Sequence, residues 1–287
     1  MNFSVIRFLG LCPVLLSIFV QALEIADYEN ALVEFMDSFV DPTEIVEAGD
    51  TPLFADDIVG RVDVTTTFEG KELNIEYVYG LFVNLEKYNT TQILGKPKAF
   101  TVQSLIVQPP IVYASVILDG LYPTIDYHLP CQLDLTLDYN DKMQIQSYDA
   151  VFRRYPQAIQ YVTPKLGPAI AKELNKTYST ATELKALLAQ RVIVDTCTEH
   201  EQYCVGDNKQ YESYQACAGY LSSIEFGEIW GAGLNTTICR YIHKYMLSYR
   251  PDVHCAHVGP SGGDMCSRTR LRGYYQHLPI QEDFRLR

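Results

Sequence analysis

Six cysteines in the last third of the chain restrict its fold more than any other feature of the sequence. The preceding two thirds carry only Cys12 and Cys131. An even cluster of cysteines in an oxidising compartment predicts three disulfides, which leaves Cys131 as a buried free thiol. The sequence does not choose among the possible pairings of Cys197, Cys204, Cys217, Cys239, Cys255 and Cys266.

The N-terminus predicts an oxidising compartment. Arg7 gives the first residues one positive charge, residues 8–20 are apolar, and Val20-Gln21-Ala22 fits the pattern that signal peptidase accepts. We therefore expect residues 1–22 to be a signal peptide, removed together with Cys12, and the mature protein to be secreted to the extracellular space. The apolar stretch is shorter than the ~20 helical residues that a bilayer requires, so we expect no membrane span.

The remaining surface chemistry agrees with an extracellular glycoprotein. Three Asn-x-Thr sequons follow the signal, and we expect N-glycans on Asn89, Asn175 and Asn235. The net charge of −12 and the pI near 4.9 argue against nucleic acid as a partner, because its phosphates would be repelled. The partner we expect is an extracellular ligand or protein whose identity the sequence does not give.

The first elements after the signal follow helix and strand periodicities. Apolar residues at spacings of three and four predict a helix over residues 28–40. A loop is expected over residues 41–60, and alternation over residues 61–68 predicts a half-buried strand. Residues 72–88 fit one helical face, with a strand as the alternative over residues 77–83.

Four strand-like runs come next, at residues 99–107, 111–118, 132–139 and 143–152. A long connection is expected over residues 119–130. A tight hairpin is expected at Asn140-Asp141, because Asn and Asp tolerate left-handed backbone angles. Leu133, Leu135 and Leu137 alternate with polar residues, which predicts a sheet with one apolar and one polar face.

This order of helix, strands, helix and four strands resembles the cone-shaped α+β fold of the nuclear transport factor two and SnoaL-like group. The resemblance rests on element order, covers residues 28–155, and matches no signature motif. It implies a cone-like α+β domain over residues 23–155, in which a curved antiparallel sheet wraps helices and encloses a pocket. In SnoaL-like enzymes, Asp, His and Tyr residues of that pocket move protons.

The chain changes character after Tyr155. Residues 156–287 are predicted to form a helical, cysteine-rich region, with helices over 158–174, interrupted near its prolines, and over 181–191. The density of Cys, His, Gly and Pro between Cys197 and Cys266 resembles an uncharacterised family of secreted proteins from fungi and other microbial eukaryotes. That resemblance implies no activity.

Two groups of residues are candidates for chemistry. Histidines among the late cysteines offer zinc or copper ligands: if all six cysteines pair, His200, His243, His254 and His257 remain, and the metal candidates are His200, His254 and His257. Oxidised cysteines are poor ligands, so structural disulfides are favoured over a metal site. His128 and Asp134 are the catalytic candidates for a cone pocket, although alternating Asp residues on a strand more often form its solvated face.

The sequence therefore favours a secreted, N-glycosylated binding or interaction protein over an enzyme. The alternatives are a secreted lyase or isomerase that uses the cone pocket, and an extracellular metal-binding protein. No nucleophile elbow, zinc-protease helix or calcium loop is present, and we expect no cofactor.

Overall fold

A six-stranded curved sheet forms the first half of the computed structural model, which describes residues 12–267 and, in α1, side chains from Ile25 onward. Its spatial order is β2-β1-β6-β5-β4-β3. The strands are β1 (Phe54–Val62), β2 (Thr67–Glu69), β3 (Lys96–Gln108), β4 (Ile111–Tyr122), β5 (Tyr127–Tyr139) and β6 (Ile145–Arg153). Every pairing is antiparallel except that of β1 with β6, which is parallel.

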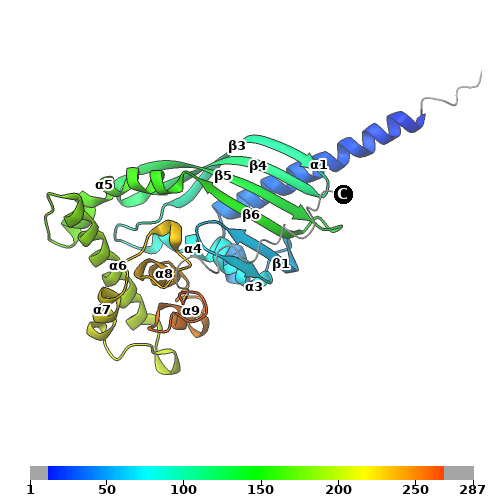
Figure 1. Ribbon diagram of the computed structural model, residues 1–287. Coiled ribbons are helices and arrows are strands. Elements are labelled where there is room, and N and C mark those ends of the chain that lie inside the picture. Colours follow the sequence, from blue (N-terminus) through cyan, green and yellow to red (C-terminus); the bar gives the residue numbers. More distant parts are fainter. Residues whose placement is uncertain (1–11, 268–287) are drawn as a thin grey trace, which may run out of the picture.

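The expected antiparallel sheet is therefore mixed. Strand β1 enters the sheet beside β6, the last strand in sequence, and the helices and strands between them form the crossover that a parallel pair requires. The α+β class and the wrapping of the sheet around helices are confirmed, and Figure 1 shows the sheet curving over α1, α3 and α4.

Helices fill the concave side of the sheet. They are α1 (Cys12–Val40), α2 (Thr43–Ala48), α3 (Lys71–Ile75), the π-helical turn η1 (Glu76–Gly80), α4 (Leu81–Val83) and the 3-10 turn η2 (Leu85–Lys87). The apolar face predicted on the first helix is buried: Leu32, Phe35 and Met36 pack against the sheet in one core with Leu135 and Leu137. Residues 72–83 are helical throughout, so the strand alternative for residues 77–83 is wrong.

The N-terminal half of α1 projects beyond the sheet (Figure 1). Residues 1–11 of the expected signal peptide lie outside the described residues, and its remainder is the first part of this helix. Removal at Ala22 stays a prediction. Within residues 12–267, the structure contains no helix with the length and apolar character needed to cross a membrane.

Two sequence predictions around the first strands are wrong. The loop expected over residues 41–60 contains α2 and most of β1, whose adjacent charges at Asp56 and Asp57 and whose Gly60 break the strict alternation of a half-buried strand. Gly60 is needed there because a Cβ at this position would overlap the ring of Tyr148 on β6. The single strand expected over residues 61–68 is divided into the end of β1, a turn over residues 63–66 and the start of β2.

The predicted breaks between the later strands are also misplaced. No long connection separates β4 from β5: both strands extend into residues 119–130, and the 3-10 turn η3 (Pro123–Ile125) joins them. The hairpin at Asn140 is wider than predicted. The side-chain oxygen of Asn140 accepts from the backbone N–H groups of Lys142 and Gln144, and the residue with a positive φ is Met143. The alternation over β5 is confirmed, because its three leucines are buried.

The second half of the chain is helical. Its elements are α5 (Tyr155–Glu173), α6 (Ala181–Tyr203), η4 (Gly206–Asn208), α7 (Tyr214–Ser223), η5 (Ile229–Gly231), α8 (Thr237–His243), η6 (Lys244–Met246) and α9 (Pro251–Val258). Helix α5 runs unbroken through Pro164 and Pro168, so the predicted interruption is wrong. Helix α6 starts at a capping box of Thr180 and Glu183 and continues beyond the predicted end at Arg191.

Three disulfides hold the helical region together. Cys197–Cys217 joins α6 to α7, Cys204–Cys255 joins the end of α6 to α9, and Cys239–Cys266 joins α8 to the segment after α9. Among the cysteines whose side chains the structure describes, Cys131 is the free one, and it is half-buried. The predicted disulfide-stapled region is therefore confirmed, and disulfides of this kind form in an oxidising compartment.

Candidate functional site

A cavity of about 130 Å³ lies inside the cone. The wall is almost entirely apolar and draws on α1, on the concave face of the sheet, on η1 and α4, and on the helical region. It includes Phe35, Met36, Phe39, Leu118, Leu129, Leu133, Leu135, Ala150, Phe152 and Ile242. Both halves of the chain are thus needed to close the cavity.

The titratable groups of this wall are weak acids. Burial raises the pKa of the Cys131 thiol to about 11 and raises the pKa values of Tyr77, Tyr148 and Tyr155 well above their ordinary range. No carboxylate or imidazole is among the residues that line the described cavity. The wall therefore suits an apolar occupant better than proton transfer near neutral pH.

The two catalytic candidates from the sequence lie away from the cavity. His128 is exposed on β5 and its Nδ1 is 2.6 Å from the carboxylate of Asp119. Asp134 faces the polar side of the sheet, where it accepts from Ser115 and pairs with Arg153. Neither residue is in contact with the apolar interior, because alternation along β5 directs Leu133 and Leu135 inward instead.

A second site lies behind the cavity wall, where three buried histidines meet. His243 is the last residue of α8, and His254 and His257 lie one turn apart on α9. They are 1%, 0% and 4% exposed, and one nitrogen of each lies within 4.8 Å of the others. We name these three residues the histidine cluster.

Each histidine of this cluster also contacts an oxygen atom. His243 Nδ1 is 2.7 Å from the carbonyl oxygen of Cys239, and His257 Nε2 is 2.8 Å from Oδ1 of Asp264. His254 Nε2 is 3.4 Å from Oε2 of Glu76. Between the imidazoles, Nδ1 of His254 and Nδ1 of His257 are 3.2 Å apart.

Burial keeps two of these imidazoles neutral. It lowers the pKa of His243 well below its ordinary value, and the neighbouring imidazoles of His257 and His254 lower it further. The pKa of His257 is also lowered, first by burial and then by His254, while Asp264 acts in the opposite direction. Neutral imidazoles have one lone pair each at neutral pH.

Tyr77 connects the cavity to the histidine cluster. Its ring lines the cavity and stacks on Phe68, with centroids 4.4 Å apart. Its hydroxyl lies 2.6 Å from Nε2 of His243, which leaves Nδ1 of that ring to donate to the Cys239 carbonyl. Tyr77 belongs to the π-helical turn η1, an irregularity that occurs often at functional sites.

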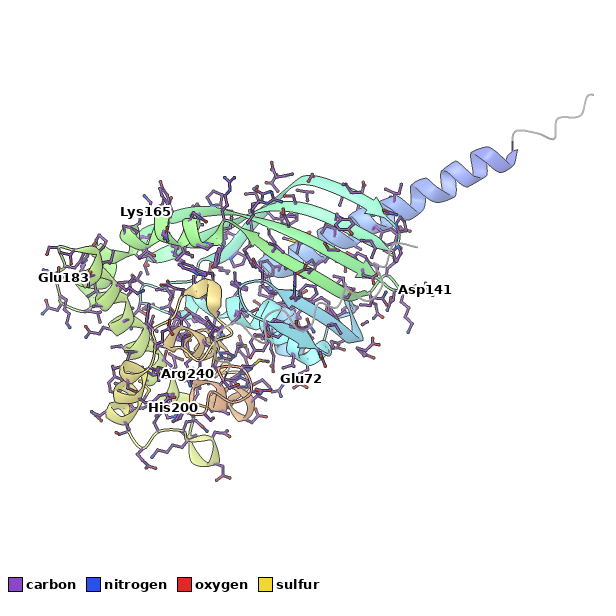
Figure 2. The ribbon with its side chains drawn as sticks, viewed as in Figure 1. Glu72, Asp141, Lys165, Glu183, His200 and Arg240 are labelled. Atoms are coloured by element: carbon purple, nitrogen blue, oxygen red, sulfur yellow. A yellow bond between two sulfur atoms is a disulfide. The ribbon has the colours of Figure 1, made fainter. Side chains whose placement is uncertain are left out.

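Of the four histidines that the sequence left as possible ligands, three lie in the cluster, although the candidates chosen were His200, His254 and His257. His200 is buried on α6, where its Nε2 accepts from the backbone of Gln210, and Figure 2 labels it within the helical region. His243 takes its place in the cluster. The turn between α8 and α9 brings His243 to His254, and no spacing in the sequence reveals this turn.

A buried lysine was also missed. Lys244 is 0% exposed and its ammonium lies over the rings of Tyr88, Tyr241 and Tyr245, at 3.7, 4.9 and 4.3 Å from their centroids. It donates to Gln92 at 2.8 Å. Burial lowers its pKa well below the ordinary value, with Glu199 opposing the shift. The residues that line the cone cavity do not include this lysine.

The three sequon asparagines are all exposed, as glycan attachment requires. Asn89 precedes the strand β3, Asn175 follows α5, and Asn235 lies just before α8.

Comparison with known proteins identifies the family. The BfoA N-terminal domain matches residues 33–150, and the BfoA family C-terminal domain matches residues 154–269. The chain is 35% identical over 236 residues to the aurasperone B biosynthesis cluster protein A of Aspergillus niger, covering 81% of this chain and 74% of that protein. It is 34% identical over 258 residues to the bifonsecin B biosynthesis cluster protein A of Aspergillus brasiliensis, covering 86% of this chain and 84% of that protein.

Similarity to solved structures is much weaker. An LEH-like epoxide hydrolase of M. tuberculosis has a TM-score of 0.35 and 9% identity, covering 47% of this chain and 91% of that chain. A Jannaschia protein described as a SnoaL-like polyketide cyclase has a TM-score of 0.35 and 10% identity, covering 46% and 89%. These values are too low to support a conclusion. The matches of both domains and the two fungal relatives place this chain in the BfoA family.

Proposed function

We propose that this protein is a secreted binding protein that holds an apolar small molecule, or the apolar part of one, in the cone cavity. The observation behind the proposal is the cavity wall, which consists almost entirely of aliphatic and aromatic side chains from both halves of the chain. Apolar cavities of this size remain dry and bind ring-sized apolar molecules, because entry removes apolar surface from water without loss of polar contacts.

The relatives support a small molecule as the occupant. Their names assign them to biosynthesis clusters for aurasperone B and bifonsecin B. By analogy, the ligand of this chain is a product or precursor of a fungal secondary-metabolite cluster. Secretion and glycosylation complete the proposal: the three disulfides and the exposed sequon asparagines support an extracellular working environment.

A lyase or isomerase in the same cavity is the second candidate, favoured by the biosynthetic clusters of the relatives. General acid–base catalysis needs a group whose pKa lies near the working pH. The thiol and hydroxyls of the wall have raised pKa values, and His128 and Asp134 lie outside it. Binding is therefore the function that the wall supports best.

Filling the cavity tests the proposal. In Ala150→Phe, a ring replaces a methyl group on the cavity wall, whereas Val151→Phe adds the same ring to the exposed face of the same strand. Indole, a ring-sized apolar probe, should bind the wild type with a negative heat-capacity change. Its affinity should fall at least tenfold in Ala150→Phe and stay within twofold in Val151→Phe. Cys131→Leu adds a smaller side-chain volume to the same cavity, and it serves as the second variant if Ala150→Phe does not fold.

Equal indole affinity in wild type, Ala150→Phe and Cys131→Leu would contradict the proposal. Mass spectrometry of an organic extract of the purified protein would then identify any natural ligand. Turnover of such a ligand by the wild type would move the enzyme candidate to first place.

A further inference from the structure

We propose that His243, His254 and His257 bind a zinc ion. This site is separate from the proposed ligand cavity and does not depend on it. The three side chains come from two short helices that the Cys204–Cys255 and Cys239–Cys266 bridges hold in place. Both cysteines nearest to His243 are oxidised and so are unavailable as thiolate ligands.

The spacing of the nitrogen atoms fits an ion. Two imidazole nitrogens at ~2.0–2.1 Å from a tetrahedral zinc ion stand roughly 3.3–3.4 Å apart. The Nδ1 atoms of His254 and His257 are already 3.2 Å apart. His243 also offers a nitrogen to this group, because one nitrogen of each of the three rings lies within 4.8 Å of the others.

The oxygens around the cluster match the surroundings of metal-bound histidines. A metal-ligating imidazole usually donates its other N–H to a carboxylate or a backbone carbonyl. Asp264 takes that role for His257, and the carbonyl of Cys239 takes it for His243. Glu76 is placed to do the same for His254, while Arg250 pairs with the other oxygen of its carboxylate.

His254 and Glu76 form a hydrogen-bond mismatch that an ion removes. If His257 donates from Nε2 to Asp264, its Nδ1 is an acceptor, and a neutral His254 must donate to it from Nδ1. His254 Nε2 then meets Oε2 of Glu76 with a lone pair on each atom. Both atoms are buried and have no hydrogen-bond partner in the described part of the chain. Leaving such a pair unsatisfied in the interior is costly.

An ion between the two Nδ1 atoms changes the protonation pattern. Each Nδ1 gives its lone pair to the ion, and the proton of His254 moves to Nε2, where it can be donated to Glu76. The ring nitrogens of His254 and His257 and Oε2 of Glu76 are then all satisfied. Without an ion, the same pair of atoms is satisfied by one additional proton, held either by Nε2 of His254 or by Oε2 of Glu76.

Zinc content and zinc affinity distinguish a bound ion from an additional proton at the cluster. The full chain, secreted with its disulfides intact and without a histidine tag, is stripped with EDTA, reloaded with zinc chloride and dialysed. We expect one zinc ion per chain by elemental mass spectrometry, and a rise in melting temperature on loading. Zinc is the probe because copper binds any such site more tightly and discriminates less.

Three variants make the test specific. His257→Gln should lose the ion. Asp264→Asn, at a side chain that is 78% exposed, should weaken zinc binding by about 10- to 100-fold. His200→Gln removes a buried histidine outside the cluster and should bind zinc as the wild type does. The proposal would be overturned if the wild type retained no zinc, or if zinc affinity were unchanged in both His257→Gln and Asp264→Asn. An additional proton would then satisfy His254 and Glu76 in place of the ion.

Discussion

The free thiol of Cys131 reports on the cavity, and its reactivity can be predicted from the structure. The side chain is half-buried on the cavity wall, and burial raises its pKa to about 11. Only the thiolate attacks a disulfide reagent, so the reaction should be slow at neutral pH and should accelerate as the pH rises toward 11.

The expected rate at pH 8 follows from two opposing effects. A thiol with a pKa of 8.5 is about one quarter thiolate at pH 8, whereas one with a pKa of 11 is about one thousandth thiolate, a difference of roughly 200-fold. The more basic thiolate is intrinsically more nucleophilic, by roughly tenfold for this pKa difference. Cys131 should therefore react about 20-fold more slowly than a small-molecule thiol, before any further slowing by restricted access.

The assay is the reaction with 4,4′-dithiodipyridine, followed by absorbance between pH 7 and 10. The rate should rise about tenfold per pH unit without a plateau near pH 9, and a saturating apolar ligand should suppress it. Cys131→Ser supplies the blank. A rate close to that of the small thiol, with a plateau near pH 9, would show that this wall is open to water and would refute the reasoning.

Two further predictions concern the construction of the protein. Cys204→Ser/Cys255→Ser opens a bridge across 51 residues, and equilibrium denaturation should show a loss of about 4 kcal/mol in unfolding free energy; a loss below about 1 kcal/mol would mean that packing alone fixes α9. The intact mass of the deglycosylated secreted protein should equal that of a chain that starts at Leu23, and glycosidase treatment should lower the mass by three N-glycans. A mass that corresponds to a start at Met1, or that glycosidase leaves unchanged, would exclude this processing. Single Asn→Gln changes should each remove one glycan, at Asn89, Asn175 and Asn235.

Local periodicity predicted the fold wherever the pattern was unambiguous. The helix at Leu32–Met36 and the strand at Leu133–Leu137 bury the expected residues, because a one-residue error there would expose a whole apolar face. Strand β1 was missed because its charged pair and Gly60 interrupt the alternation. What makes it a strand is pairing with β6, a partner far away in sequence. The same pairing of β1 with β6 is parallel and therefore makes the sheet mixed.

The chemistry was harder to predict than the fold. The number of late cysteines and their compartment predicted that they are oxidised, whereas the sequence did not predict which cysteine pairs with which. The histidine cluster needed the turn between α8 and α9, which brings His243 to His254. His200 is as buried as His243 but faces Gln210, and only the course of the chain after α6 decides this.

The π-helical turn η1 explains how one chain can hold two sites in contact. Its consecutive residues face different surroundings: Glu76 faces His254, Tyr77 contacts His243 from the cavity wall, and Val78 packs in the core of the sheet. A zinc ion that binds Nε2 of His243 removes the acceptor of the Tyr77 hydroxyl, and this hydroxyl is then available at the cavity wall. Ion binding and ligand binding would therefore be coupled through one side chain, and thermodynamic linkage makes that coupling equal in both directions.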